Sequence, residues 1–163
     1  MLFAWGMGLA GERAAAPIHW FYGLLVVLGL LTAGRRWLGG AAGWLAAAML
    51  LVTPSIVLLA GWPYVDLALL LYATLAFLSL ARFCEGGPQS RRWLILSGAF
   101  AGLALSTKYT ALALLPALAL ALLVAQTFIS ESRIRNLQSA IRSLLLLCGV
   151  ALLVWSPWLI KNS

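Results

Sequence analysis

Long apolar runs separated by short polar breaks dominate the pattern of this 163-residue chain. A helix needs about 20 apolar residues to cross a hydrocarbon core about 30 Å thick. The runs therefore predict an all-α fold, a polytopic bundle of about six transmembrane helices that occupies residues 1–163 as a single domain. The expected spans are residues 16–34, 38–60, 63–83, 93–106, 110–128 and 143–160.

Prolines, glycines and charged residues mark where these spans bend or end. Arg35 and Arg36 close the first span, Pro54 is expected to kink the second, and Pro63 suits the first turn of the third. A tight turn is expected at residues 107–109, and the polar segment 129–142 predicts a short surface helix before the last span.

Two pairs of glycines have the spacing that lets membrane helices approach closely. Gly39 and Gly43 lie in the second span, and Gly98 and Gly102 lie in the fourth. Small residues four positions apart form one smooth helix face, so the most direct interpretation of both pairs is helix packing.

The composition excludes an ordinary soluble domain, because 64% of the residues are apolar, 9% are charged and the mean hydropathy is +1.01. A net charge of +7 would suggest nucleic-acid binding in a soluble protein. Here the basic residues lie in short loops, where the positive-inside rule explains them. We therefore predict no nucleic-acid partner and expect membrane lipid and neighbouring membrane helices as partners.

The same rule orients the chain in the membrane. Eight of the eleven basic residues follow the first, third and fifth spans, namely Arg35, Arg36, Arg82, Arg91, Arg92, Arg133, Arg135 and Arg142. These loops are assigned to the cytoplasm. Both termini, the segment 61–66 and the segment 106–110 are then expected on the extracytoplasmic side.

Asp66 is the only aspartate of the chain, and it lies at the edge of an apolar span in the segment GWPYVD. A carboxylate inside a membrane costs about 2.5 to 3.5 kcal/mol on insertion scales, so such a residue is a functional candidate by default. Lys108 is expected on the same side of the membrane. Both have a structural alternative, because a carboxylate at a helix start and a cation at a helix end are also favoured by the helix dipole.

The remaining polar residues of this side offer further ligands. Tyr64 and Tyr109 are suited to contact a sugar, and Asp66 is suited to bind a divalent metal ion, the one cofactor that we expect. His19 is better explained as a satisfied polar residue near a helix end than as a base. Pairing with each other explains Glu12 and Arg13, while Lys161 and the tryptophans 62, 155 and 158 are explained as interfacial anchors.

No nucleophile elbow, phosphate-binding glycine loop or HExxH motif is present, so motifs alone name no reaction. Several segments, however, resemble the polytopic glycosyltransferases of the C superfamily. They are most similar to family 39, the dolichyl-phosphate-mannose-protein mannosyltransferase-like proteins, and to the bacterial aminoarabinose transferases. The segments are GERAAAPIHWFYGLL, GWLAAAMLLVTPSIVLLAGWPYVDLALLLYATLAF, RRWLILSGAFAGLALSTKYTALALLPAL and WSPWLIKN, and the resemblance spans nearly the whole chain.

This resemblance implies transfer of a sugar from a polyprenyl-phosphate carrier to an acceptor at the extracytoplasmic face of a bacterial inner membrane. Asp66 would match an acidic residue that lines the donor site, and is the candidate catalytic residue and metal ligand. Lys108 would contact the donor phosphate, with Tyr64 and Tyr109 as substrate contacts. The family's principal acid lies in an earlier outer loop, which implies that this chain is an internal piece of a longer enzyme and is inactive by itself.

Two other classes of protein stay open at this point. A membrane scaffold or assembly subunit would use the small-residue faces to pack against helices of other chains. A transporter half should show a second break like GWPYVD in an inverted repeat, and the chain has none.

Overall fold

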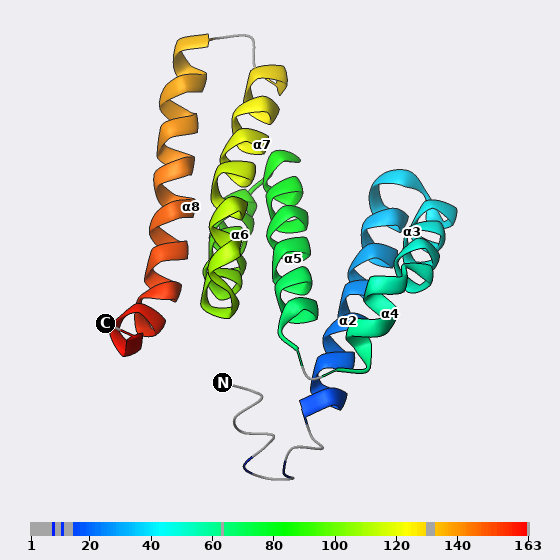
Figure 1. Ribbon diagram of the computed structural model, residues 1–163. Coiled ribbons are helices and arrows are strands. Elements are labelled where there is room, and N and C mark those ends of the chain that lie inside the picture. The colour runs from blue at the N-terminus through cyan, green and yellow to red at the C-terminus, as the bar shows by residue number, and fades with distance from the viewer. Residues whose placement is uncertain (1–7, 9–10, 12–14, 63, 130–132, 163) are drawn as a thin grey trace. The chain divides into compact units, whose positions relative to one another are not determined.

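The computed structural model describes residues 8, 11, 15–62, 64–129 and 133–162. All regular structure in these residues is helical, as predicted (Figure 1). The α-helices are α2 (Ala15–Ala33), α3 (Gly40–Val52), α4 (Pro54–Ala60), α5 (Asp66–Cys84), α6 (Ser90–Thr107), α7 (Leu114–Ile129) and α8 (Arg133–Asn162). A π-helical turn, η2 (Gly34–Leu38), follows α2, and a 3₁₀ turn, η3 (Tyr109–Ala113), precedes α7.

Three helical stretches in the described part of the chain are long and apolar enough to cross a membrane. They are Ala16–Leu38, Asp66–Cys84 and Gln138–Asn162, and the pair α3 and α4 makes a fourth if it counts as one bent span. Together with the composition, these stretches identify an integral membrane protein. The predicted fourth and fifth spans form α6 and the shorter apolar stretch Tyr109–Ala125.

The chain divides into two compact units, residues 1–71 and 72–163. In the first unit, α3 runs back beside α2, and Gly34 and Gly43 meet where the two helices are in closest contact. A Cβ atom on Gly34 would overlap the backbone of Gly43, and a Cβ atom on Gly43 would lie in tight contact with α2, 3.1 Å from the Leu31 carbonyl oxygen. The packing role predicted for Gly43 is therefore confirmed.

The prediction for Gly39 is wrong. Nothing lies within 4 Å of its Cβ position, and its φ of 92° is in the region that favours glycine, so this residue makes the turn between η2 and α3. Arg35 and Arg36 do not end the first span either, because helical structure continues through them as far as Leu38.

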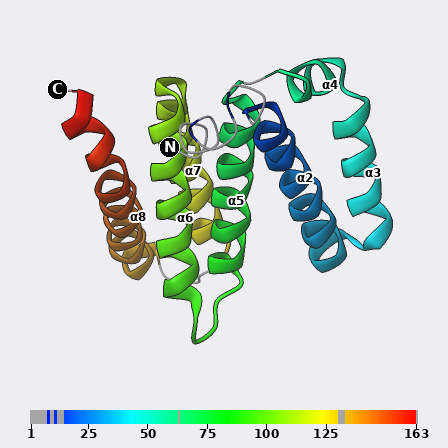
Figure 2. The same cartoon turned by 90° about the horizontal axis from the view of Figure 1, so that it is seen from below.

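Pro54 breaks the second span more sharply than a kink. The axes of α3 and α4 differ by 69°, and Figure 2 shows α4 turning away from the direction of α3. Proline has no N–H, so carbonyls in the preceding turn need other donors. The Thr53 hydroxyl donates to the Met49 carbonyl at 2.7 Å, and the Thr53 N–H donates to that of Leu50 at 3.2 Å.

In the second unit, α6 packs along α8 through the predicted glycine pair. A Cβ atom on Gly98 would lie 2.6 Å from the carbonyl oxygen of Leu147, and one on Gly102 would lie 2.5 Å from that of Ala151. Both distances are shorter than an ordinary contact of about 3.5 Å. The two glycines therefore let the backbones of α6 and α8 touch.

The separate surface helix predicted at residues 129–142 is not observed, because α8 is continuous from Arg133 to Asn162. The segment lacks glycine and proline, so the polar residues simply extend the helix of the last span. Pro157 lies inside this helix, and the Ser156 hydroxyl donates to the Leu153 carbonyl at 2.8 Å, the group that the missing proline N–H would otherwise bind.

A glycine turn and one buried hydrogen bond connect α5 and α6. Gly86 and Gly87 have φ angles of 78° and 98°, which accommodate the tight reversal. Ser97, which is fully buried, donates from its hydroxyl to the Ala76 carbonyl of α5 at 2.9 Å. Near the glycine turn, Cζ of Arg82 in α5 lies 4.8 Å from the centre of the Trp93 ring in α6.

Candidate functional site

Asp66 is the first residue of α5 and belongs to the first unit. The helix begins here rather than at Pro63, which lies outside the described residues. Asp66 is an acidic residue in the first turn, where the helix dipole favours its negative charge. Asp66 is partly exposed, while the next two residues, Leu67 and Ala68, are buried. The carboxylate thus lies at the boundary between the packed interior and the surface.

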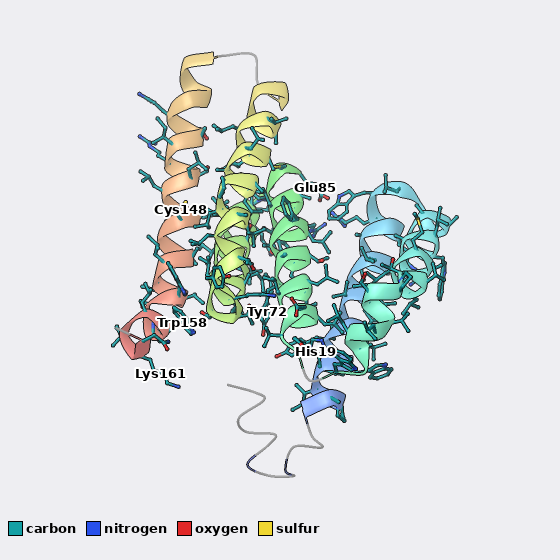
Figure 3. All side chains as sticks on the ribbon, viewed as in Figure 1. His19, Tyr72, Glu85, Cys148, Trp158 and Lys161 are labelled. Carbon is teal, nitrogen blue, oxygen red and sulfur yellow. The ribbon has the colours of Figure 1, made fainter. Side chains whose placement is uncertain are left out.

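The face of α2 that lies against α5 carries His19. This residue lies in the second turn of α2 (Figure 3) and is fully buried. Gly23, one turn further along α2, has its Cβ position 3.3 Å from Cδ1 of Leu67. The first turn of α5 therefore packs directly against this face of α2.

Tyr64 lies two residues before α5 and is about half exposed, at 48%. Its ring stacks on that of Trp62, with 5.9 Å between the ring centres and 23° between the planes. The two rings form an aromatic surface beside Asp66 in the chain. Such a surface is suited to pack against the apolar face of a sugar or to lie at the lipid headgroups.

Lys108 and Tyr109 belong to the second unit, at the break between α6 and η3. The hydroxyl groups of Ser106 and Thr107 donate to carbonyls of the last turn of α6, namely those of Gly102, Leu103 and Ala104. The Ala104 carbonyl also accepts from the Lys108 N–H, at 3.2 Å, where α6 ends. Lys108 itself is in an extended conformation, and Tyr109 is 75% exposed.

The structure places Asp66, His19 and Tyr64 in one unit and Lys108 and Tyr109 in the other. Whether the two groups of residues meet stays a prediction. Within the described residues, no three His, Cys, Asp or Glu side chains form a group that could hold a metal ion. Glu12 and Arg13, for which we predicted a pair, lie outside the described residues.

His19 was assigned only a structural role by the sequence, although one signal pointed to it. His19, Tyr22 and Val26 are spaced three and four residues apart, so they occupy one face of a helix. All three are buried. A histidine on the buried face of an apolar span is unusual, so this spacing was the signal that could have marked His19 as a candidate functional residue.

Comparisons with known proteins support the resemblance seen in the sequence. The sequence model of the family described as dolichyl-phosphate-mannose-protein mannosyltransferase matches residues 3–160, nearly the entire chain. No curated protein and no solved structure matches the chain significantly. Apolar spans, the helical fold and this match lead to one assignment. The chain belongs to the dolichyl-phosphate-mannose-protein mannosyltransferase family, whose members are membrane glycosyltransferases.

Proposed function

We propose that this chain is a core part of an enzyme that transfers a sugar from a polyprenyl-phosphate carrier to an acceptor at the extracytoplasmic face of a bacterial inner membrane. The observation that carries the proposal is the position of Asp66. A partly exposed carboxylate begins the membrane-spanning helix α5, whose next residue, Leu67, is buried against α2. Membrane spans rarely hold such a group without a functional reason.

The proposed topology has six spans with both termini on the extracytoplasmic side. The distribution of basic residues supports it, since eight of eleven fall in the loops assigned to the cytoplasm. In this topology the start of α5 and the end of α6 open to the same side of the membrane. Asp66 and Lys108 can then act on one donor molecule.

The proposed reaction is a displacement with inversion at the anomeric carbon. The acceptor oxygen forms a bond to this carbon, while the bond from the carbon to the phosphate oxygen breaks. Its electron pair leaves with the polyprenyl phosphate. Asp66 takes the proton of the acceptor hydroxyl, and Lys108 neutralises the charge on the departing phosphate. Tyr64 and Tyr109 contact the substrate through exposed aromatic rings.

A divalent cation stays part of the proposal only as an aid to donor binding. Asp66 would supply one oxygen ligand, and the donor phosphate and water would supply the others, which is the usual arrangement for magnesium at phosphate substrates. The described residues include no three-residue metal cluster, so no step of the displacement is assigned to the cation.

The alternative of a scaffold that packs through small residues loses its main support. It required glycine faces that are available to other chains. Gly98 and Gly102 are instead covered by α8, and Gly43 is covered by α2. Packing inside this chain therefore accounts for these glycines.

The test is sugar transfer by membranes that contain the complete product of the gene, with radiolabelled polyprenyl-phosphate mannose as donor. The complete product is used because we propose that this chain is inactive by itself. Asp66→Asn should lower transfer by at least about 100-fold, the contribution typical of a general base. Its matched control is Glu85→Gln, which removes a carboxylate just beyond the other end of α5.

Lys108→Gln should lower donor affinity by about 10- to 100-fold, the value of a hydrogen bond to a charged group. Its control is Lys161→Gln, which removes an exposed lysine at the end of α8 (Figure 3). Wild-type activity in Asp66→Asn would remove this carboxylate from the site. No transfer by the wild-type enzyme with any polyprenyl-phosphate sugar would overturn the proposed function.

A further inference from the structure

Two arginines begin α6 at the end where a helix disfavours positive charge. Arg91 and Arg92 lie in its first turn, both are exposed, and this turn holds no acidic residue. The helix dipole favours anions here and disfavours cations. In the part of the chain that the structure describes, the ion pair of this region joins Arg82 and Glu85, and it includes neither arginine of α6. Helix stability therefore does not explain Arg91 and Arg92.

The positive-inside rule explains positive charge in these loops, but it does not explain the type of residue. All eight basic residues in the loops assigned to the cytoplasm are arginines, and both lysines of the chain are assigned to the opposite side. Lysine and arginine count equally in this rule. Only arginine has a planar fork of N–H groups, which can bind a phosphate through two hydrogen bonds. The choice of arginine therefore indicates a phosphate ligand.

Arg91 lies on the face of α6 that packs against α8. The two helices run in the same direction, because the glycine contacts advance along both of them together. Seven residues make nearly two turns, so Arg91 shares a face with Gly98, which contacts Leu147. The same step back along α8 leads from Leu147 to Ala140, which is buried. Arg91 stays exposed, so it lies where the contact between α6 and α8 opens to the surface.

The side of this opening that α8 provides is small and polar. Ser139 is exposed and Ser143, one turn later, is 8% exposed; we call these two serines and Arg91 the seam mouth. Serine side chains are short, and their hydroxyls can donate to phosphate oxygens. The seam mouth thus combines one guanidinium with two hydroxyl groups.

Nearby residues indicate that the phosphate belongs to a lipid. Ile95 follows Arg91 by one turn on the same side of α6 and is 39% exposed, so an apolar surface continues from the guanidinium along the span. Trp93 lies two residues after Arg91, and tryptophan is enriched at the depth of the lipid headgroups. A cation at headgroup depth above an apolar surface matches the headgroup and acyl chain of a phospholipid.

We propose that the seam mouth binds the phosphate of an anionic phospholipid, with Arg91 as the bidentate ligand and the two serines as further donors. Basic sites between membrane helices favour anionic lipids, because a headgroup without a cation of its own is attracted by the arginine charge. This site is independent of sugar transfer, so it stands or falls apart from the proposed function.

The test measures lipid binding to the purified 163-residue protein in detergent by native mass spectrometry, with phosphatidylglycerol as the probe. Arg91→Gln should raise the Kd by at least about 10-fold, the value of a hydrogen bond to a charged group. Arg91→Lys keeps the charge without the fork, and should recover only part of the affinity. Phosphatidylglycerol should also raise the unfolding temperature of the wild-type protein more than that of Arg91→Gln.

Arg142→Gln is the matched control. Arg142 is also an exposed arginine and precedes Ser143 directly, so its replacement removes the same charge at the same level of α8. It lies five residues before Leu147, which is about 140° around the helix from the side that contacts α6. Arg142→Gln should therefore leave the Kd of phosphatidylglycerol unchanged.

Three results would overturn the proposal. Equal weakening by Arg91→Gln and Arg142→Gln would show that diffuse charge attracts the lipid, without a site at the seam mouth. Equal affinity for phosphatidylcholine would show that the anionic headgroup is not recognised. Displacement of phosphatidylglycerol by millimolar inorganic phosphate would identify a site for free anions instead of a lipid.

Discussion

Replacement of Gly102 by alanine tests the contact between α6 and α8 most directly. The added Cβ atom would lie 2.5 Å from the Ala151 carbonyl oxygen and 2.7 Å from Cβ of Val154. Optimal contacts between such atoms are about 3.5 Å or longer, so the two helices would have to separate by up to about 1 Å. Neither obstacle is the end of a flexible side chain, so the strain cannot be relieved locally.

Two opposing effects determine the size of the result. Overpacking of a tight interface costs typically about 1 to 3 kcal/mol, while replacing glycine by alanine inside a helix gains about 1 kcal/mol. Gly149→Ala provides a matched control, because Gly149 lies in α8 and nothing lies within 4 Å of its Cβ position. Gly149→Ala therefore has the stability gain of alanine in a helix, without the steric overlap.

The free energy of unfolding of both variants should be measured by denaturant titration in the same detergent. We expect Gly102→Ala to be less stable than Gly149→Ala by about 1 to 3 kcal/mol. Gly98→Ala should behave like Gly102→Ala, because its Cβ would lie 2.6 Å from the Leu147 carbonyl oxygen. Equal stability of Gly102→Ala and Gly149→Ala would refute the close approach of α6 and α8.

Three further predictions concern the second unit and the topology. Ser97→Ala removes the buried bond to the Ala76 carbonyl of α5 and should cost about 0.5 to 1.5 kcal/mol, the net value of a typical hydrogen bond; unchanged unfolding would mean that the bond is absent. Trp93→Leu removes the ring next to Arg82 and should cost about 0.5 to 1 kcal/mol in the same titration, whereas no loss would contradict the cation–π contact. In a cysteine-free background, a membrane-impermeant maleimide should label Gly61→Cys and not Gln89→Cys in intact cells, and the reverse pattern would contradict the proposed orientation.

Much of the fold could be predicted from the sequence because membrane spans leave strong local signals. The length of each apolar run and the position of Pro54 located helices and a break that the structure confirms. The predicted ends of the helices were less accurate than their positions along the chain. Helix continues through Arg35 and Arg36, and α8 absorbs the polar segment before the last span, since charged residues do not end a helix unless the backbone also changes direction.

The glycine pairs show the limit of a motif. The same four-residue spacing occurs at residues 39 and 43 and at residues 98 and 102. In the second pair both glycines pack on another helix, whereas in the first pair only Gly43 does. Gly39 instead adopts a positive φ in a turn. Spacing identifies residues that allow close approach, but the turn that precedes α3 determines which of them is used.

The sequence by itself determined that this is an all-helical membrane protein of the mannosyltransferase family and that Asp66 is its unusual carboxylate. These properties depend on composition, on run lengths and on neighbours close in the chain. Only the tertiary structure decided what surrounds Asp66. Gly23 lies 44 residues before Leu67 in the sequence, and the two residues meet because α2 packs against the first turn of α5. A contact of this kind depends on how separate helices pack, which no local pattern of residues encodes.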